Sequence, residues 1–210
     1  MRSPIHREGF FMAGSLLVLA MVFSTISRWL GRIFYLATAF TLYFFRDPER
    51  QIPEGDCLIV SPADGKVVGI DSVEHVPFLD GPAKRVSIFL SVFDVHINRS
   101  PIKGKIAYRH YSPGEFLAAF EPKASVKNEQ NAVGIEDADG YRVLVKQIAG
   151  LIARRILCWK NPGDQVGAGE RFGLIRFGSR TEIYMPLDAR IEVRLGQRVQ
   201  GGASVIARRC

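Results

Sequence analysis

Three residues able to do acid–base or nucleophilic chemistry stand in short segments rich in turn residues. They are Asp64 in SPADG, His96 in FDVHINRSP and Ser179 in GLIRFGS. An imidazole can hold and give a proton near neutral pH, and an activated serine hydroxyl is a nucleophile. Each residue also has an ordinary interpretation, since Asp-Gly and Gly-Ser are common turn pairs and most histidines only pack or are solvated. No segment by itself therefore establishes a catalytic site.

Taken together and in order, four segments carry a resemblance to a known family. They are FFRDP (44–48), SPADG (61–65), FDVHINRSP (93–101) and GLIRFGS (173–179). The chain resembles the phosphatidylserine decarboxylases, in particular their short form, in which the self-cleaving site reads FGS where the longer enzymes carry LGST. The resemblance covers nearly the whole chain. It implies that the Gly178-Ser179 bond is cut, giving a large chain 1–178 and a small chain 179–210.

A serine after a glycine suits such a cleavage chemically. The hydroxyl of Ser179 can attack the carbonyl of Gly178 to form an ester, whose β-elimination leaves dehydroalanine, and hydrolysis then gives a ketone. Glycine leaves the attacked carbonyl unhindered and tolerates a strained backbone. The resemblance thus implies a pyruvoyl cofactor made from Ser179. This group forms a Schiff base with the substrate amine and accepts the electrons left by CO2, converting phosphatidylserine to phosphatidylethanolamine.

The resemblance also implies roles for three further residues. His96 is expected to deliver a proton to the substrate α-carbon, and Asp64 to support self-cleavage by orienting a base or stabilising its charged form. The longer enzymes carry a second histidine, the base of an Asp-His-Ser arrangement, where this chain has Arg99. Arginine is no base at neutral pH, so either His96 serves both steps or Asp64 and backbone strain suffice. Arg99 then binds the substrate phosphate or carboxylate, or forms a surface ion pair.

The elements that must position these residues are mostly strands. After Pro48, short apolar runs alternate with Gly, Pro and Asp, which predicts a mainly β (α+β) fold with a compact β-rich catalytic domain over 48–210. A short helix is expected at 114–120, and a solvated loop, with at most a substrate contact, at 123–131 (KASVKNEQN). The expected strands are 57–60, 66–70, 85–92, 141–148, 154–159, 172–177, 182–185 and 191–195.

The N-terminal region, residues 1–47, contains two uncharged apolar runs at 10–26 and 33–45, separated by the basic sequence SRWLGR. The pattern predicts a hydrophobic helical hairpin that attaches to a membrane, either spanning it or dipping into it, with a short basic turn at 27–32. A secretory signal is disfavoured because a second apolar run follows at once. Buried core helices are disfavoured because neither run has a polar face. Basic residues flank both runs, so no orientation follows.

Charge and cysteine content limit the remaining classes. There are 28 Lys and Arg against 21 Asp and Glu, a net charge of +7, which suits an anionic lipid or membrane surface. These charges are scattered and no recognition motif accompanies them, so nucleic acid is not an expected partner. Cys57, Cys158 and Cys210 suggest neither a disulfide framework nor a zinc site, and no metal is expected.

The expected setting is the cytoplasmic membrane, with the catalytic domain on the cytoplasmic side. The expected partners are phosphatidylserine in the membrane, a heterodimer of the protein's own two cleavage chains, and a homodimer of these. One rival is a pyruvoyl enzyme acting on a soluble amino acid, which the hydrophobic hairpin disfavours. Another is a membrane-tethered carrier domain of the lipoyl type, which would have to present Lys160 at a hairpin tip.

Overall fold

The computed structural model describes residues 3–55, 57–118, 123–151, 155–176 and 178–209. The chain forms two compact units, Met1–Glu49 and Arg50–Cys210. The second contains every residue singled out for chemistry.

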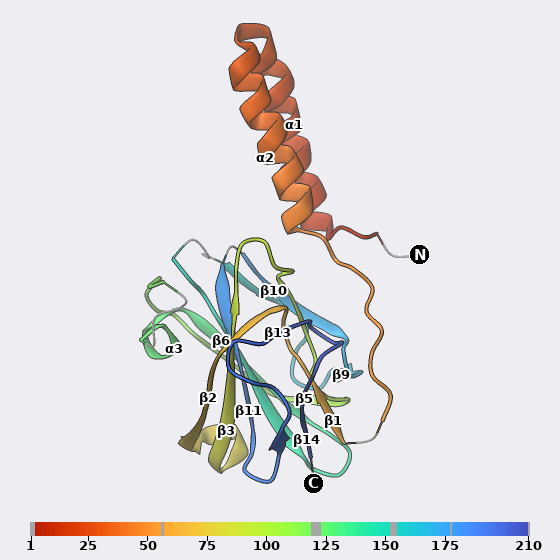
Figure 1. Ribbon diagram of the computed structural model, residues 1–210, viewed down its shortest axis with the longest axis vertical. Helices are drawn as coiled ribbons and strands as arrows, with labels where there is room; N and C mark the ends of the chain where they lie inside the picture. Colours follow the sequence, from red (N-terminus) through yellow and green to blue (C-terminus); the bar gives the residue numbers. More distant parts are fainter. Residues whose placement is uncertain (1–2, 56, 119–122, 152–154, 177, 210) are drawn as a thin grey trace. The chain divides into compact units, whose positions relative to one another are not determined.

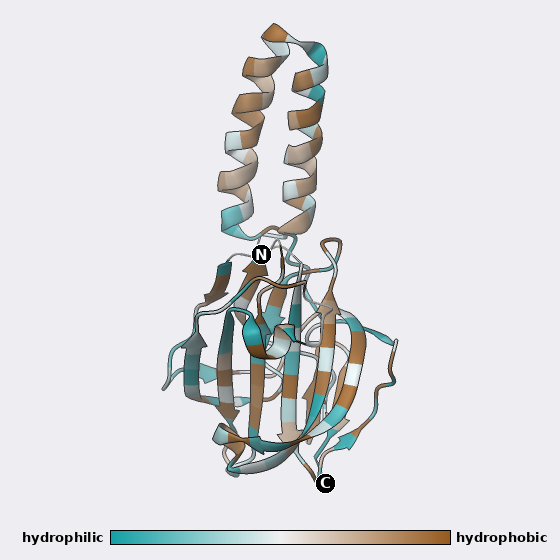
Figure 2. Ribbon diagram, turned by 90° about the vertical axis from the view of Figure 1, so that its left-hand side faces the viewer, coloured by the Kyte–Doolittle hydropathy of each residue, from teal (hydrophilic) through white to brown (hydrophobic). Residues whose placement is uncertain are grey.

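The N-terminal unit is a helical hairpin of α1 (Arg7–Ile26) and α2 (Arg28–Phe44). Figure 2 shows the two helices side by side and mostly in hydrophobic colours. A Cβ at Gly31 would lie 2.0 Å from the Ser24 hydroxyl oxygen, so glycine lets the helices approach closely there. The expected basic turn at 27–32 is wrong, because Ser27 alone joins the helices and Arg28 already begins α2. No residue of the sequence RWLGR (28–32) prevents α2 from beginning at Arg28.

The second unit is mainly β, as the spacing of apolar runs and turn residues predicts. Figure 1 shows its strands curled around one another. The strands are β1 (Leu58–Val60), β2 (Gly65–Val76), β3 (Gly81–Leu90), β4 (Ile97–Arg99), β5 (Gly104–Ser112), β6 (Gln130–Glu136), β7 (Arg142–Ile148), β8 (Arg155–Cys158), β9 (Gln165–Val166), β10 (Arg171–Arg176), β11 (Ser179–Pro186), β12 (Arg190–Ile191), β13 (Arg198–Val199) and β14 (Val205–Arg208). Two short helical turns, η1 (Pro77–Leu79) and α3 (Ala124–Lys127), accompany them.

The strands form three sheets. The largest has the order β13-β2-β3-β11-β7-β6-β5-β9, and two smaller ones have the orders β4-β10-β8 and β1-β14-β12. Every pairing is antiparallel. Strand β11 is central in the large sheet, between β3 and β7, and all but its last residue are buried. Ser179 is its first residue, so the site begins at the end of a strand that is fixed on both sides.

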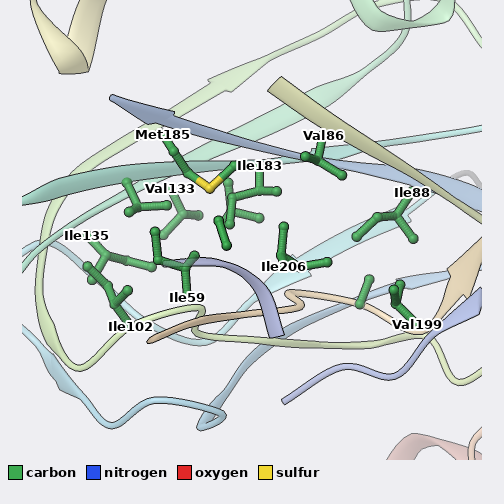
Figure 3. Close-up of a cluster of buried hydrophobic side chains, with 14 of the residues drawn as sticks. Ile59, Val86, Ile88, Ile102, Val133, Ile135, Ile183, Met185, Val199 and Ile206 are labelled. Carbon is green, nitrogen blue, oxygen red and sulfur yellow. The ribbon is translucent and has the colours of Figure 1, made fainter. Parts of the chain in front are cut away.

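The main core packs aliphatic side chains of the large sheet against those of the smaller ones. Figure 3 shows Val86, Ile88 and Ile183 from the large sheet together with Ile59 and Ile206 from β1 and β14. Alternate residues of β11 point to opposite faces, as in any strand. Odd-numbered residues from Ser179 to Met185 therefore share one face, which is the face of the main core.

The segment between β5 and β6 differs from the sequence-based expectation. The expected helix at 114–120 is wrong for the described residues 114–118, where Glu115 instead forms a bridge with Asn128. The expected solvated loop at 123–131 is also wrong, since it contains α3 and four buried residues, Ala124, Ser125, Asn128 and Asn131. The polar sequence predicted exposure to solvent. Its asparagine side-chain amides are instead hydrogen-bonded inside the domain, and a sequence pattern does not show where such partners come from.

Candidate active site

Ser179 and Gly178 lie where β11 begins. The Ser179 side chain is fully buried, and its hydroxyl oxygen has no hydrogen-bond partner among the described residues. A buried hydroxyl left without a partner costs about 1–3 kcal/mol, so such groups are rare outside functional sites. Gly178 has a φ of +65°, in the left-handed region that other residues adopt with strain. The backbone thus turns sharply immediately before the serine.

His96, just before β4, contacts this turn. Its Nε2 accepts a hydrogen bond from the Gly178 amide at 3.2 Å, and its Nδ1 lies 3.0 Å from the Asp94 carbonyl oxygen. An amide N–H only donates and a carbonyl only accepts, so these partners assign the ring proton to Nδ1. The ring is fully buried. His96 therefore presents a basic nitrogen to the residue before Ser179.

Asp64 sits in the turn before β2, and both carboxylate oxygens are bound. Arg50 donates to one oxygen at 2.7 Å, and the Gly201 amide donates to the other at 2.8 Å. Burial raises the pKa of this carboxyl, while Arg50, the Gly201 hydrogen bond and Arg99 act in the opposite direction. The carboxylate is thus held in place by Arg50 and the backbone, in a setting that makes its ionisation sensitive to its neighbours.

Arg99, the last residue of β4, lies inside the domain. Its side chain donates to the Gly169 carbonyl at 3.1 Å, and only 3 % of the residue is exposed. The interpretation as a surface ion pair is therefore wrong. Its backbone amide donates to the Pro62 carbonyl at 2.9 Å, which joins β4 to the SPADG turn. A buried guanidinium thus stands near Asp64 where the longer enzymes are expected to have a histidine.

A large cavity lies elsewhere in the second unit. It has a volume of about 820 Å³ and is lined by residues such as Lys105, Glu136 and Arg209. Glu136 and Gln130 lie at the two ends of β6. Gln130 pairs with Ile148 of β7, and Ile148 also pairs with Arg180, the residue after Ser179. The cavity therefore opens at the far end of the large sheet from Ser179, and its size is no argument for catalysis there.

Comparison with known proteins agrees with the motifs. The family model described as "Phosphatidylserine decarboxylase" matches residues 37–207. The chain belongs to the phosphatidylserine decarboxylase family. Proteins named "Phosphatidylserine decarboxylase proenzyme" from Symbiobacterium thermophilum and Carboxydothermus hydrogenoformans are 50 % and 46 % identical to it, over 209 and 211 residues. The alignments cover 99 % of this chain in both cases, and 97 % and 99 % of the two relatives.

In the second unit of this phosphatidylserine decarboxylase family member, three of the four motifs, SPADG, FDVHINRSP and GLIRFGS, come together. His96 is in direct contact with Gly178, although 82 residues separate them. Asp64 and Arg99 form a second group, linked by the backbone bond from Arg99 to Pro62 and by the effect of Arg99 on the Asp64 pKa. The roles predicted for these residues stay predictions, but their positions are compatible with one shared site.

Two functional candidates of this family member escaped the sequence reasoning. Asn98 lies between His96 and Arg99 on β4, and Gln147 lies on β7; both are fully buried and hydrogen-bonded to each other at 2.9 Å. A polar residue inside an apolar strand pattern, as Gln147 is in YRVLVKQIAG, is a usable signal, because burying an amide requires partners. For Asn98 the signal was its place inside the FDVHINRSP motif.

Proposed function

We propose that this chain is a phosphatidylserine decarboxylase proenzyme that cuts itself between Gly178 and Ser179 and carries a pyruvoyl group made from Ser179. The observation that carries the proposal is the turn at Gly178. It presents a buried serine hydroxyl, with no hydrogen-bond partner among the residues that the structure describes, immediately after a left-handed glycine whose amide donates to His96. The family relationship supplies the reaction, and this geometry supplies a nucleophile and a base beside one peptide bond.

Self-cleavage begins with the serine hydroxyl. The Ser179 oxygen attacks the Gly178 carbonyl carbon, the C–N bond breaks, and an ester with a free amine on residue 179 results. Removal of the α-proton of residue 179 then expels the Gly178 carboxylate and leaves dehydroalanine. Water hydrolyses its imine tautomer, which releases ammonia and leaves the ketone. Glycine at position 178 adopts the left-handed backbone conformation without a Cβ clash and leaves its carbonyl unhindered for the first step.

His96 is the proposed base for this sequence. Its ring proton on Nδ1 is held by the Asp94 carbonyl, which leaves the Nε2 lone pair on the side of the scissile residue. A neutral imidazole in this tautomer can take the hydroxyl proton of Ser179 and later return a proton. Because Arg99 cannot act as a base, His96 serves both the self-cleavage and the protonation of the substrate α-carbon in this proposal.

The surroundings of residue 179 suit a pyruvoyl group that is formed from the chain itself. The pyruvoyl group supplies a carbonyl that condenses with the substrate amine and draws off the electrons left by CO2. Residue 179 is buried at the start of β11, paired with Leu90 of β3. After cleavage, β11 of the small chain remains hydrogen-bonded between β3 and β7 of the large chain. This supports the proposal that the two chains stay together as a heterodimer.

The Arg50–Asp64 pair gives a prediction on pH. In Arg50→Met, the Asp64 carboxyl loses the nearest positive charge that lowers its pKa, so the pKa rises further. If ionised Asp64 supports cleavage, the acid limb of the pH–rate profile should lie at a higher pH in the variant. At pH values on that limb, the variant should cleave several-fold more slowly than the unchanged protein. Cleavage rates between about pH 5 and pH 8 measure this shift.

The control for this prediction is Arg142→Met, which removes another ion-paired arginine, bound to Glu136 and Asp80 near the opposite end of the sheet. Its pH profile should match that of the unchanged protein. An Arg50→Met profile with an unmoved acid limb would show that the charge on Asp64 is not needed for cleavage.

Arg99 is the proposed contact for the anionic headgroup of the substrate. Its guanidinium is buried near Asp64 and binds a backbone carbonyl, and a planar guanidinium can also hold a phosphate or carboxylate with two hydrogen bonds. In Arg99→Met, the KM of the cleaved protein for phosphatidylserine should rise by about ten- to a hundredfold, because a charge-assisted hydrogen bond is lost. Vesicle assays normalised to the cleaved fraction test this, and an unchanged KM would rule out the contact.

The hairpin is proposed to hold the enzyme in the cytoplasmic membrane, with the catalytic domain on the cytoplasmic side. Among the described residues, α1 is the one helix long and apolar enough to cross a membrane by length and composition. Its 20 residues extend about 30 Å, the thickness of a hydrocarbon core. Phe11, Trp29 and Leu36 are all more than 70 % exposed on the hairpin, as lipid-facing residues would be.

The test of the proposed function is the intact mass of the purified protein together with a lipid assay. We expect two chains divided after Gly178, the smaller without a free amine and reactive toward hydroxylamine, and CO2 release from phosphatidylserine vesicles. A single uncut chain in folded, membrane-bound protein would refute it. CO2 release from water-soluble serine derivatives but not from vesicles would favour the soluble-substrate rival.

The carrier-domain rival receives no support from Lys160. Its ammonium is 2.6 Å from a Glu170 carboxylate oxygen and also contacts the Gln165 carbonyl. A carrier lysine has to extend freely from a hairpin tip to visit other active sites. A mass scan for an acyl adduct on Lys160 is expected to find none.

A further inference from the structure

The two strands that carry the site belong to different sheets. His96 and Arg99 flank or end β4, which pairs with β10 in a three-stranded sheet, whereas Ser179 begins β11 of the eight-stranded sheet. No backbone ladder therefore sets β4 against β11. A backbone bond from the Ile175 amide to the His96 carbonyl (3.3 Å) holds His96 beside β10, and a direct connection from β4 to β11 must be made by side chains.

Side-chain amides make this connection. Asn98 donates from Nδ2 to the Thr181 hydroxyl oxygen at 3.1 Å and to the Pro62 carbonyl at 3.4 Å. Its Oδ1 accepts from Nε2 of Gln147 at 2.9 Å. Asn131 in turn donates to Oε1 of Gln147 at 2.8 Å. Because each amide has a donor and an acceptor end, this chain of bonds allows only one orientation of the Asn98 amide.

The hydrogen-bonded series of polar side chains is buried, and a glycine leaves space for it. Asn98, Gln147 and Thr181 are fully buried, so water does not compete for these bonds. A Cβ at Gly173 would lie 2.7 Å from Gln147 Nε2 and 2.4 Å from the Leu157 carbonyl oxygen. The glycine that opens GLIRFGS thus admits the Gln147 amide between β7 and β10. This gives a physical reason for one part of that motif.

We propose that Asn98 is a positioning residue for self-cleavage, which fixes the His96 side of the site against the Ser179 side through Thr181. Asn98 lies two residues after His96, and Thr181 lies two residues after Ser179. The hydrogen bond between Asn98 and Thr181 is thus two residues along each segment from His96 and Ser179, which is one repeat of a β-strand. The proposal rests on the proposed function, since it concerns the same peptide bond. A small displacement of a base is enough to slow a reaction about a hundredfold.

The test follows uncut full-length chain over time after cell-free synthesis in the presence of phospholipid vesicles. Thr181→Val keeps the side-chain shape and removes only the hydroxyl that Asn98 binds, and we expect cleavage to slow about tenfold. Asn98→Leu removes the whole connection and should slow it about a hundredfold. The double variant should be no slower than Asn98→Leu, because both changes break one connection.

Ser87→Ala is the matched control. It removes another buried hydroxyl, on the neighbouring strand β3, that is bound to Glu182 at 3.2 Å on the opposite face of β11. Its cleavage rate should stay within about twofold of the unchanged protein, although its stability in urea falls as in Thr181→Val. The midpoint of the pH profile should not move in Thr181→Val, since only geometry changes.

Two results would overturn the proposal. One is a Thr181→Val chain that cleaves as fast as Ser87→Ala at equal stability. The other is additive slowing in the double variant, which would mean that Asn98 and Thr181 act separately. Failure of the proposed function is distinguishable, because then the unchanged protein itself would remain uncut and no variant rate could be compared.

Discussion

Replacement of Ser179 by alanine is expected to leave the protein as a single uncut chain without decarboxylase activity, a loss of more than about 10³-fold. In the proposed mechanism the Ser179 hydroxyl is the attacking group, and the ketone forms from the carbon skeleton of the same residue. The side chain is fully buried and its oxygen has no hydrogen-bond partner in the described part of the chain. Removal of such a group should leave the free energy of unfolding unchanged or raise it, because no bond is lost.

A gel and intact mass of the two proteins, with urea unfolding of both, measure this prediction. The combination of full stability and no cleavage is what separates a reacting serine from a structural one. Ser179→Thr is the informative control: its hydroxyl can still form the ester, but its β-methyl group prevents a pyruvoyl product. Normal cleavage in Ser179→Ala would show that the proposed bond is not the one that is cut.

Replacement of His96 by glutamine is expected to slow self-cleavage by about 10²- to 10⁴-fold, the usual contribution of a general base. Glutamine can still accept the hydrogen bond from the Gly178 amide through its carbonyl oxygen, which keeps the local contact that His96 makes at 3.2 Å. It cannot take a proton. The variant therefore removes the chemistry with little change to the packing.

The rate of appearance of the two chains measures the effect. His110→Gln is the matched control, because His110 is an exposed histidine on β5 that belongs to no catalytic motif, and its rate should be normal. Any cleaved His96→Gln protein that accumulates should also decarboxylate slowly per mole of small chain. Normal cleavage in His96→Gln would favour the alternative in which Asp64 and backbone strain suffice.

Much of this site was predictable because its residues stand in short contiguous motifs. The turn residues around Asp64 and Gly178 are local, and turn chemistry depends mainly on the residues of the turn itself. The β-rich class and the apolar hairpin were predictable for the same reason, but β5 and β6 were not predicted, and the expected strand at 191–195 is reduced to the two residues of β12. The expected helix at 114–120 was wrong because the tertiary pairing of Glu115 with Asn128 overrides weak helix propensity.

The burial of Arg99 and Asn131 was not predictable. Arg99 was expected either to bind substrate or to lie on the surface, and Asn131 to lie in a solvated loop, yet both are buried. A polar side chain can be buried where the fold supplies partners, and these partners come from distant segments: Gly169 for Arg99 and Gln147 for Asn131. Sequence pattern reports the cost of burial but not the partners that offset it.

The sequence by itself indicated the candidate reacting groups, the β-rich class and the hydrophobic hairpin, because residue type, turn chemistry and apolar periodicity are local properties. Only the tertiary structure decided which groups meet. The contact of His96 with Gly178 and the bond of Asn98 to Thr181 join residues more than 80 positions apart in the sequence, and the second bond connects strands of different sheets. Such contacts depend on strand order and register, which are set by the packing of the whole core and not by any one segment.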